Sequence, residues 1–460
     1  MRSDHPLIRY GGSLFRHQPF RFLKGAAGAY IAYPIAESRE KRNVRPKVAE
    51  LHQHYALPVE QRRQIALDRL VQILQFAGEH VPYYRDLFRE RNFDPLKAGL
   101  DPRYLETLPY LTKDIIREQG TRLLSKPLEA VRHHACKTGG STGLSCTIYY
   151  DQEAADYSSA VTFYARQRIG KRGYRPELHF ACRFPGEAAP NWPSREDFKC
   201  FAMNRSNIFF DSIDDKGLEE IWQTLKARRP FLAHGHPSTM YALACYVERK
   251  YGSGKAFEVF ESSGELLEPQ ARLIIERALR CRVINRYGLA ELGVMAYELD
   301  GHDAGFQILE SEGWPESRQL DAEADGASEL VFTGFRNHLM PLIRYATGDL
   351  ARVEERNGAM YLADVVGRIH DVVPINGVAH ATHHIQDMLD HRVGGIQEFQ
   401  IDLRTVPPTL RIVLEPWATE EDTTRKLRGY WGDAFAIEYV GHDALVRVGS
   451  RAKFRHVVTA

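Results

Sequence analysis

The chain lacks the features that would place it at once in several classes of protein. It has no run of about 20 apolar residues, the length that a membrane-spanning helix requires. No apolar signal-peptide core precedes Arg9 or Arg16, so we expect a cytoplasmic protein. The six cysteines include no Cys-x-x-Cys pair, which favours free thiols in a reducing compartment. With 61 Lys and Arg against 60 Asp and Glu, there is no electrostatic case for nucleic-acid binding.

What the chain does have is an alternation of helix and strand patterns. Its 460 residues suffice for two or three domains. Apolar residues at helical spacing predict helices over 58–78, 214–228 and 237–251. Short apolar runs predict strands over 230–235 and 257–260. This alternation indicates an α/β fold, a large domain with mixed or parallel sheets flanked by helices.

The remaining segments complete the expected layout. Residues 178–213 should alternate strands with Pro/Gly loops, and residues 321–362 are strand-rich with Gly turns. We expect three parts: an N-terminal extension (1–47), a large domain (48–367) and a small α+β lid (368–460) that moves on the large domain.

The N-terminal extension mixes aromatic and basic residues. Between Ser13 and Glu37, Phe20, Phe22 and Tyr30 alternate with Arg21 and Lys24. This composition suits peripheral contact with an anionic membrane surface. It suits equally a segment that packs on the body of the protein or forms a dimer contact. Both alternatives stay open, and the chain is a monomer or a homodimer.

A glycine-rich segment after Lys137 is typical of a phosphate-binding loop. Glycine lets the backbone approach an anion, and the amides of a tight loop point at phosphate oxygens. A strand pattern at Ile148–Tyr150 follows it, unlike a Walker loop, which opens a helix. The alternative is a hairpin loop without a ligand. The predicted phosphate ligands are Thr138, Gly139, Gly140, Ser141, Thr142 and Gly143.

Two further segments carry side chains suited to a nucleotide. The strand pattern Arg282–Asn285 runs into Tyr287, whose ring can lie along an adenine, and Glu291 is a hard oxygen ligand suited to Mg²⁺. Near residue 345 the chain reads Tyr-Ala-Thr-Gly-Asp, and Asp349 can accept from both hydroxyls of a ribose. The order and spacing of these segments make coincidence an unsatisfactory explanation.

Together these segments resemble the adenylate-forming enzymes, and within them the phenylacetate–CoA ligase-like branch that includes capsular polysaccharide synthesis proteins. The resemblance runs from about Val81 to the C-terminus. Its further matches are Val-Pro-Tyr-Tyr-Arg at 81–85, Leu-Pro-Tyr-Leu-Thr-Lys at 108–113, and Glu-Leu-Val-Phe-Thr at 329–333, which leads into Pro-Leu-Ile-Arg-Tyr at 341–345.

The resemblance implies roles for further residues. It implies ATP, Mg²⁺ and a carboxylate as ligands, with CoA as a possible acceptor. By this resemblance Lys453 is the catalytic lysine, Asp371 the hinge between the domains, and His234 a contact in the acyl pocket. The predicted adenine and ribose contacts are Gly264, Glu265, Asn285, Arg286, Tyr287, Gly288, Asp349 and Arg368.

The chain also departs from the family pattern. The phosphate loop ends Gly143-Leu144-Ser145 where relatives have Gly-Lys-Pro, and Lys453 follows Ala452 in place of glycine. Residues 297–300 contain no cysteine, so we expect no metal site of the kind some relatives carry there. Arg183 and its charged neighbours make the substrate region polar, which argues against an aromatic acid and leaves room for a sugar acid or an amino acid.

Three functions therefore compete. The first is activation of a carboxylic acid as an acyl-adenylate, followed by transfer to CoA or an amine. The second is transfer of AMP to an acceptor hydroxyl. The third is a non-catalytic nucleotide-binding role in polysaccharide assembly, suggested by the missing loop lysine.

Overall fold

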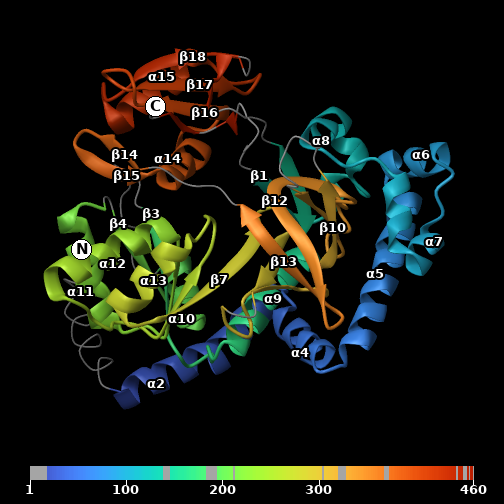
Figure 1. Cartoon of the computed structure of the whole chain (residues 1–460), viewed down its shortest axis with the longest axis horizontal. Coiled ribbons are helices and arrows are strands. Elements are labelled where there is room, and N and C mark those ends of the chain that lie inside the picture. Colours follow the sequence, from blue (N-terminus) through green and yellow to red (C-terminus); the bar gives the residue numbers. More distant parts are fainter. Residues whose placement is uncertain are drawn as a thin grey trace.

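A single large sheet organises the protein. The structure is a computed structural model. It describes residues 18–137, 146–182, 194–210, 213–302, 305–319, 328–366, 372–441, 444–448, 453–454 and 456–458. The large sheet has 11 strands in the order β10-β11-β12-β13-β9-β8-β7-β6-β5-β3-β4. Its two halves differ in strand direction and in their covering helices (Figure 1).

The half that ends in β4 is parallel. Its strands are β3 (Glu177–Cys182), β4 (Arg205–Phe210), β5 (Leu232–Gly235), β6 (Val259–Ser262) and β7 (Arg282–Leu289). The helices between them are α10 (Arg195–Ala202), α11 (Asp215–Arg228), α12 (Pro237–Tyr251) and α13 (Pro269–Leu279).

Helices cover both faces of the parallel half. On one face Trp222 of α11 and Leu243 of α12 pack with Phe260 of β6 in one apolar core. On the other, Tyr164 and the neighbouring strand residue Val259 share a core with α4. Here the covering helices are α4 (Val44–Tyr55) and α9 (Gln152–Arg168). The structure thus confirms the predicted α/β class.

The other half of the sheet is antiparallel. It contains β8 (Gly293–Tyr297), β9 (Phe306–Ile308), β10 (Gly313–Gln319), β11 (Ser328–Gly334), β12 (Tyr345–Arg356) and β13 (Ala359–Val366). A helical block packs against it, with Leu70 and Tyr84 in the same core as Tyr345. That block holds α5 (Val59–His80), α6 (Pro82–Glu90), α7 (Pro95–Leu100), η2 (Pro102–Thr107), α8 (Lys113–Gln119), η3 (Gly120–Leu123) and η4 (Leu128–Ala130).

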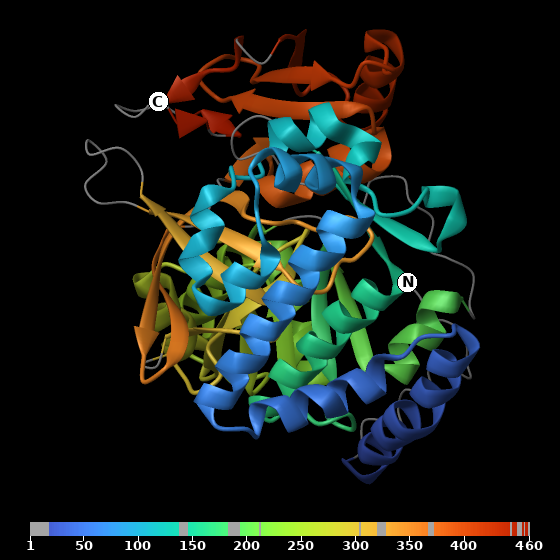
Figure 2. The ribbon, with the colours of Figure 1, turned by 90° about the vertical axis from the view of Figure 1, so that its right-hand side faces the viewer.

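The C-terminal residues form a separate small sheet with its own core. Its order is β18-β17-β16-β21, and Phe399, Ile412 and Trp431 lie in that core. In both views this unit lies together at one end of the molecule (Figure 1, Figure 2). Its elements are β14 (Val372–Ile375), β15 (Val378–Ala381), α14 (Thr382–Met388), η5 (Leu389–Val393), β16 (Ile396–Asp402), β17 (Thr409–Leu414), α15 (Glu420–Trp431), β18 (Ala436–Tyr439), β19 (Arg447–Val448), β20 (Lys453–Phe454) and β21 (Val457–Val458).

The N-terminal segment is helical. It forms α2 (Gln18–Ala27), η1 (Gly28–Ala32) and α3 (Tyr33–Arg39). One face packs on the body: the rings of Phe22 and Tyr174 lie 5.0 Å apart, and Arg21 donates to the carbonyl of Arg229 at 2.9 Å. Other apolar side chains of this segment remain exposed, with Tyr30 at 61% and Ile31 at 62%. Within the described residues, no helix is long and apolar enough to cross a bilayer.

Candidate functional site

Two of the predicted segments meet through Tyr287 and Asp349. The hydroxyl of Tyr287, on β7, donates to Asp349 Oδ2, on β12, at 2.8 Å. Both residues are buried, at 9% and 8% exposure. Burial, and then the negative charge of Asp349, raise the pKa of Tyr287 well above its usual value, so the phenol keeps its proton. The contact fixes the Asp349 carboxylate beside the tyrosine ring.

A second contact ties Glu291 to the same strand. The hydroxyl of Tyr345, fully buried at the start of β12, donates to Glu291 Oε1 at 2.8 Å. Burial and then the charge of Glu291 raise the pKa of the Cys136 thiol to about 12, so this thiol stays protonated. The predicted nucleotide residues Tyr287, Glu291 and Asp349 therefore lie together.

The matched N-terminal segments explain how β12 is positioned. The Tyr84 hydroxyl donates to the carbonyl of Pro341 at 2.9 Å and accepts from the amide of Ile343 at 3.2 Å. The amide of Leu111 donates to the carbonyl of Arg344 at 2.9 Å, and its carbonyl accepts from the amide of Ala346 at 3.0 Å. The segments 81–85 and 108–113 thus hydrogen-bond to the backbone at 341–346, which leads into β12. This explains why these motifs occur together.

The phosphate loop itself, residues 138–143, lies outside the described residues, but its flanks do not. β1 (His133–Lys137) and β2 (Thr147–Asp151) form an antiparallel pair that ends at Lys137 and Thr147. Lys137 Nζ donates to the carbonyl of Ile396 and lies 3.7 Å from Asp390 Oδ1 and 4.0 Å from Glu415 Oε1. The last residue before the loop thus contacts the C-terminal unit.

Several predicted adenine contacts hold local structure in place. Glu265 accepts from both the amide and the hydroxyl of Ser238 at 3.0 Å, and so caps the N-terminus of α12. Gly264 has φ +87°, and a Cβ there would lie 2.7 Å from His236 Cε1, so the turn needs glycine. The side chain of Asn285 accepts from the amide of Arg286 at 3.0 Å. Their contact with adenine stays a prediction.

Arg286 points away from Asp349. Successive strand residues face opposite sides of a sheet, and Arg286 Nε donates to Ser263 Oγ at 3.2 Å. Its Nη1 lies 3.8 Å from Glu261 Oε2, while Gly288 follows at a bulge between β7 and β8. Arg286 therefore belongs to a second cluster, which also contains His234.

That second cluster is built on a buried carboxylate that sequence reasoning missed. Glu261 is fully buried in the apolar strand β6, and Arg166 Nη2 of α9 donates to its Oε2 at 2.5 Å. Tyr297 also donates to Glu261. Burial opposes ionisation, but Arg166 and then His234 hold the pKa of Glu261 well below its usual value. The signal in the sequence was a single Glu inside the strand Val-Phe-Glu-Ser.

Three of the remaining predicted site residues, Arg183, Arg368 and Asp371, fall outside the described part of the chain. Lys453 lies in β20, whose backbone pairs with β19. Among the described residues, no group of three or more His, Cys, Asp or Glu side chains could hold a metal. Glu291 offers a single carboxylate, which fits Mg²⁺ bound mainly by phosphate oxygens and water.

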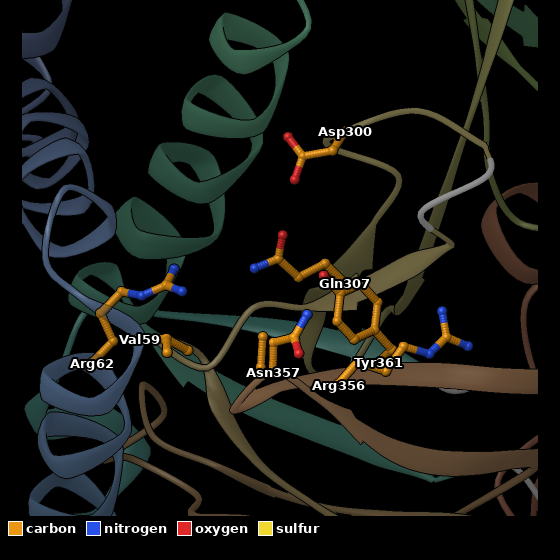
Figure 3. Close-up of a pocket in the computed structure, with 8 residues that line it drawn as sticks. Val59, Arg62, Asp300, Gln307, Arg356, Asn357 and Tyr361 are labelled. Carbon is orange, nitrogen blue, oxygen red and sulfur yellow. The ribbon is translucent and has the colours of Figure 1, made fainter.

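Two hollows lie elsewhere on the molecule. One, of about 420 Å³, is lined by side chains that include Arg62, Asp300, Gln307 and Tyr361 (Figure 3). The other, of about 960 Å³, lies beside Tyr110 and Glu316. Neither is lined by Tyr287, Glu291 or Asp349, but the larger one is lined by Leu108, Pro109, Tyr110 and Arg344, which belong to the family-like segments 108–113 and 341–345.

Comparison with known proteins gives a consistent set of relatives. No family model matches the chain. It is 22% identical over 318 residues to protein CapK of Staphylococcus aureus, covering 66% of this chain and 67% of CapK. It is 26% identical over 340 residues to a phenylacetate–coenzyme A ligase of Pseudomonas putida (70% and 73% covered), and 28% identical over 343 residues to that of Escherichia coli K12 (70% and 74%).

The fold has counterparts among solved structures. A 2-hydroxyisobutyryl-CoA ligase in complex with 2-HIB-AMP and CoA, in the thioesterification state, superposes with a TM-score of 0.53 at 19% identity. The match covers 87% of this chain and 90% of that one. The same ligase in its postadenylation state gives a TM-score of 0.51. At this identity the likeness concerns the fold alone.

Proposed function

Because the chain belongs to the adenylate-forming superfamily, with distant homology to phenylacetate–CoA ligases and to CapK, we propose that it activates a carboxylic acid with ATP. The observation that carries this proposal is the convergence of Tyr287, Glu291 and Asp349, from segments far apart in the chain, on one cluster in which Tyr287 and Asp349 are buried. The proposed product is an acyl-adenylate, and the leaving group is pyrophosphate.

Asp349 and Tyr287 would hold the nucleoside. The Tyr287 hydroxyl occupies Asp349 Oδ2, which leaves Oδ1 to accept from a ribose hydroxyl. The protonated phenol orients that carboxylate and presents its ring to adenine. Arg368 would help to fix the ribose, as its place in the family motif suggests.

The repulsion between the reacting anions determines the roles that we propose for the other residues. The acid's carboxylate oxygen bonds to the α-phosphorus while the bond from that phosphorus to the bridging oxygen breaks, and pyrophosphate leaves. Two anions must approach, so positive groups have to face them. The amides and hydroxyls of residues 138–143 would take the β- and γ-phosphates, and the ammonium of Lys453 would lie between the carboxylate and the α-phosphate. Bound Mg²⁺, held by Glu291, would neutralise phosphate charge.

A second half-reaction would follow a movement of the C-terminal unit. We propose that this unit turns about the segment containing Asp371, so that a thiol such as CoA, or an amine, reaches the acyl-adenylate. The contact of Lys137 with the C-terminal unit supports communication between the phosphate loop and that movement. AMP transfer to a hydroxyl and a purely nucleotide-binding role are the competing outcomes.

Nucleotide binding is the first test. Isothermal titration of the full chain with Mg-ATP and with AMP should give saturable binding, and Asp349→Ala should weaken both by at least about tenfold because the ribose contact is lost. Glu329→Gln, beside the same strand but bonded to the Gly348 amide, is the control. Absence of any ATP or AMP binding would sink the proposal. Mass spectrometry of the products then distinguishes acyl transfer from AMP transfer.

A further inference from the structure

A row of polar side chains crosses the parallel half of the sheet and takes no part in the proposed nucleotide site. His179 of β3, His234 of β5 and Glu261 of β6 are paired residues on neighbouring strands. Paired residues of parallel strands share a face, so the three side chains lie side by side. Polar groups in a sheet interior are costly unless they are hydrogen-bonded. Each side chain in the row therefore needs a hydrogen-bond partner.

The charges of this cluster leave one cation in excess. Arg166 and Lys171 pair with Glu261 and Glu177, at 2.5 Å and 3.2 Å respectively. Arg286 is the fifth charge, and it has only the Ser263 hydroxyl at 3.2 Å and a Glu261 oxygen at 3.8 Å. Within the described part of the chain, neither Nη atom of Arg286 has a recorded hydrogen-bond acceptor. The Arg286 side chain is 18% exposed, and its Nη atoms are the donors that we assign to a ligand.

The two histidines supply acceptors beside that donor. His234 Nδ1 lies 2.8 Å from Glu261 Oε2, and since a carboxylate only accepts, Nδ1 carries the proton. Burial, and then the charge of Arg286, lower the pKa of His234 to about 3, so the ring is neutral and Nε2 is an acceptor. His179 Nε2 lies 3.2 Å from Glu177 Oε1 and 3.4 Å from Arg166 Nη1; the shorter contact, with the carboxylate, favours a proton on Nε2 and leaves Nδ1 as the acceptor. These rings are 20% and 21% exposed.

We propose that His179, His234 and Arg286, the polar triad, select an acid that carries hydroxyl groups, such as a hexuronate or another polyhydroxylated ring acid. This inference rests on the proposed function. A hydroxyl can accept from Arg286 and donate to an imidazole nitrogen at the same time, so a pair of ring hydroxyls satisfies both kinds of group. The reacting carboxylate would then point toward the Asp349 cluster, on the other side of β7.

The competing classes of acid each leave part of the triad unpaired. An aryl or alkyl group buries donors and acceptors without partners. An ammonium group would face the surplus positive charge of Arg286. A second carboxylate would satisfy Arg286 but offers no proton to either histidine at neutral pH. Only a hydroxylated acid matches all three side chains.

The test compares acids of matched size by titration into the full chain with AMP present. Glucuronate should bind at least about tenfold more tightly than cyclohexanecarboxylate, phenylacetate or adipate, because unpaired buried polar groups are costly. Arg286→Leu should remove this preference for glucuronate over the other acids. Arg282→Leu, four residues earlier on β7 and bonded to the carbonyl of Ile169 at 2.5 Å, is the matched control and should keep it. His234→Phe provides a second variant should the first be unstable.

The outcomes separate this inference from the proposed function. Tightest binding of an apolar acid or of adipate overturns the inference, as does the absence of binding by every acid. Glucuronate binding without ATP-dependent pyrophosphate release would support the triad and contradict the proposed adenylation. Pyrophosphate release with phenylacetate but not with glucuronate would support the proposed adenylation and contradict the inference about the polar triad.

Discussion

Single side chains decide most of the proposed chemistry, and Lys453 is the residue on which the proposed adenylation would depend most. Its neighbours Arg447, Arg451 and Arg455 make the tail basic, so a general charge effect has to be distinguished from a positioned ammonium. Only an ammonium placed between the carboxylate and the α-phosphate stabilises the transition state more than the bound reactants.

We predict that Lys453→Ala slows adenylation by about 10²–10³-fold, the usual loss for one positioned charge. ATP affinity and thermal stability should change little. Pyrophosphate release under single-turnover conditions measures the effect, with Arg451→Ala and Arg455→Ala as charge-matched controls. Equal rates in all three variants would show that another residue supplies the charge.

His234, one of the two histidines of the polar triad, also predicts how stability depends on pH. The pKa of His234 is lowered from 6.5 to about 3 in the folded chain by burial and then by Arg286. The unfolded chain therefore binds a proton below about pH 6.5 that the folded chain does not. Stability from this residue is present above that pH and is lost as the pH falls toward 3.

Thermal unfolding at pH 7.5, 6.5 and 5 should accordingly show a steeper fall in Tm for the wild type than for His234→Gln. His80→Gln, at a histidine that is 54% exposed, is the control and should follow the wild type. Parallel curves for wild type and His234→Gln would contradict a neutral, buried imidazole.

At the scale of elements, periodicity predicted α5, α11 and α12 well, but it missed the 17-residue helix α9 as well as short helices. α5 and α12 lie within two residues of the predicted 58–78 and 237–251, because regular apolar spacing follows the buried stripe. α10 was missed in the segment expected to hold only strands and loops. Its eight residues are too few for a stripe, although Ser194 and Asp197 form a capping box that marks its start.

The candidate site, too, could be predicted only in part. Motif order located Tyr287, Glu291 and Asp349 without any knowledge of the sheet. Glu261 and Arg166 could not be found in this way, because their partners come from strands and helices up to 95 residues apart. The pairing of β5, β6 and β7 brings His234, Glu261 and Arg286 together, and α9, packed on the sheet, adds Arg166.

The exposed apolar side chains of the N-terminal helices predict a contact with a membrane surface. The apolar side chains of this segment that remain exposed are Phe20, Phe22, Leu23, Tyr30, Ile31 and Ile35. We predict that the protein sediments with vesicles containing phosphatidylserine, and that Ile31→Glu weakens this binding several-fold. Leu100→Glu, at an 89% exposed leucine on α7, should have no effect. If Ile31→Glu instead converts a dimer to a monomer in sedimentation velocity, the surface is a contact between two copies.

At the scale of the whole molecule, the large sheet and the C-terminal unit have separate apolar cores. From the sequence we expect a boundary between residues 367 and 368 that separates a large domain from a small lid. The relative placement of the two units could not be predicted, because it depends on contacts such as that between Lys137 and Asp390, 253 positions later in the chain. The division into domains remains our proposal.

The clamp of Tyr84 on the backbone near Pro341 has a consequence for how the molecule is made. This hydrogen bond joins residues 257 positions apart, so one of the longest loops in the chain closes when the site forms. Contacts of such long range form slowly, because chain entropy is lost before the contact stabilises anything. We expect helix formation to precede the nucleotide site during refolding. Recovery of AMP binding should lag behind far-ultraviolet circular dichroism, and Tyr84→Phe should lengthen that lag; simultaneous recovery would refute the order.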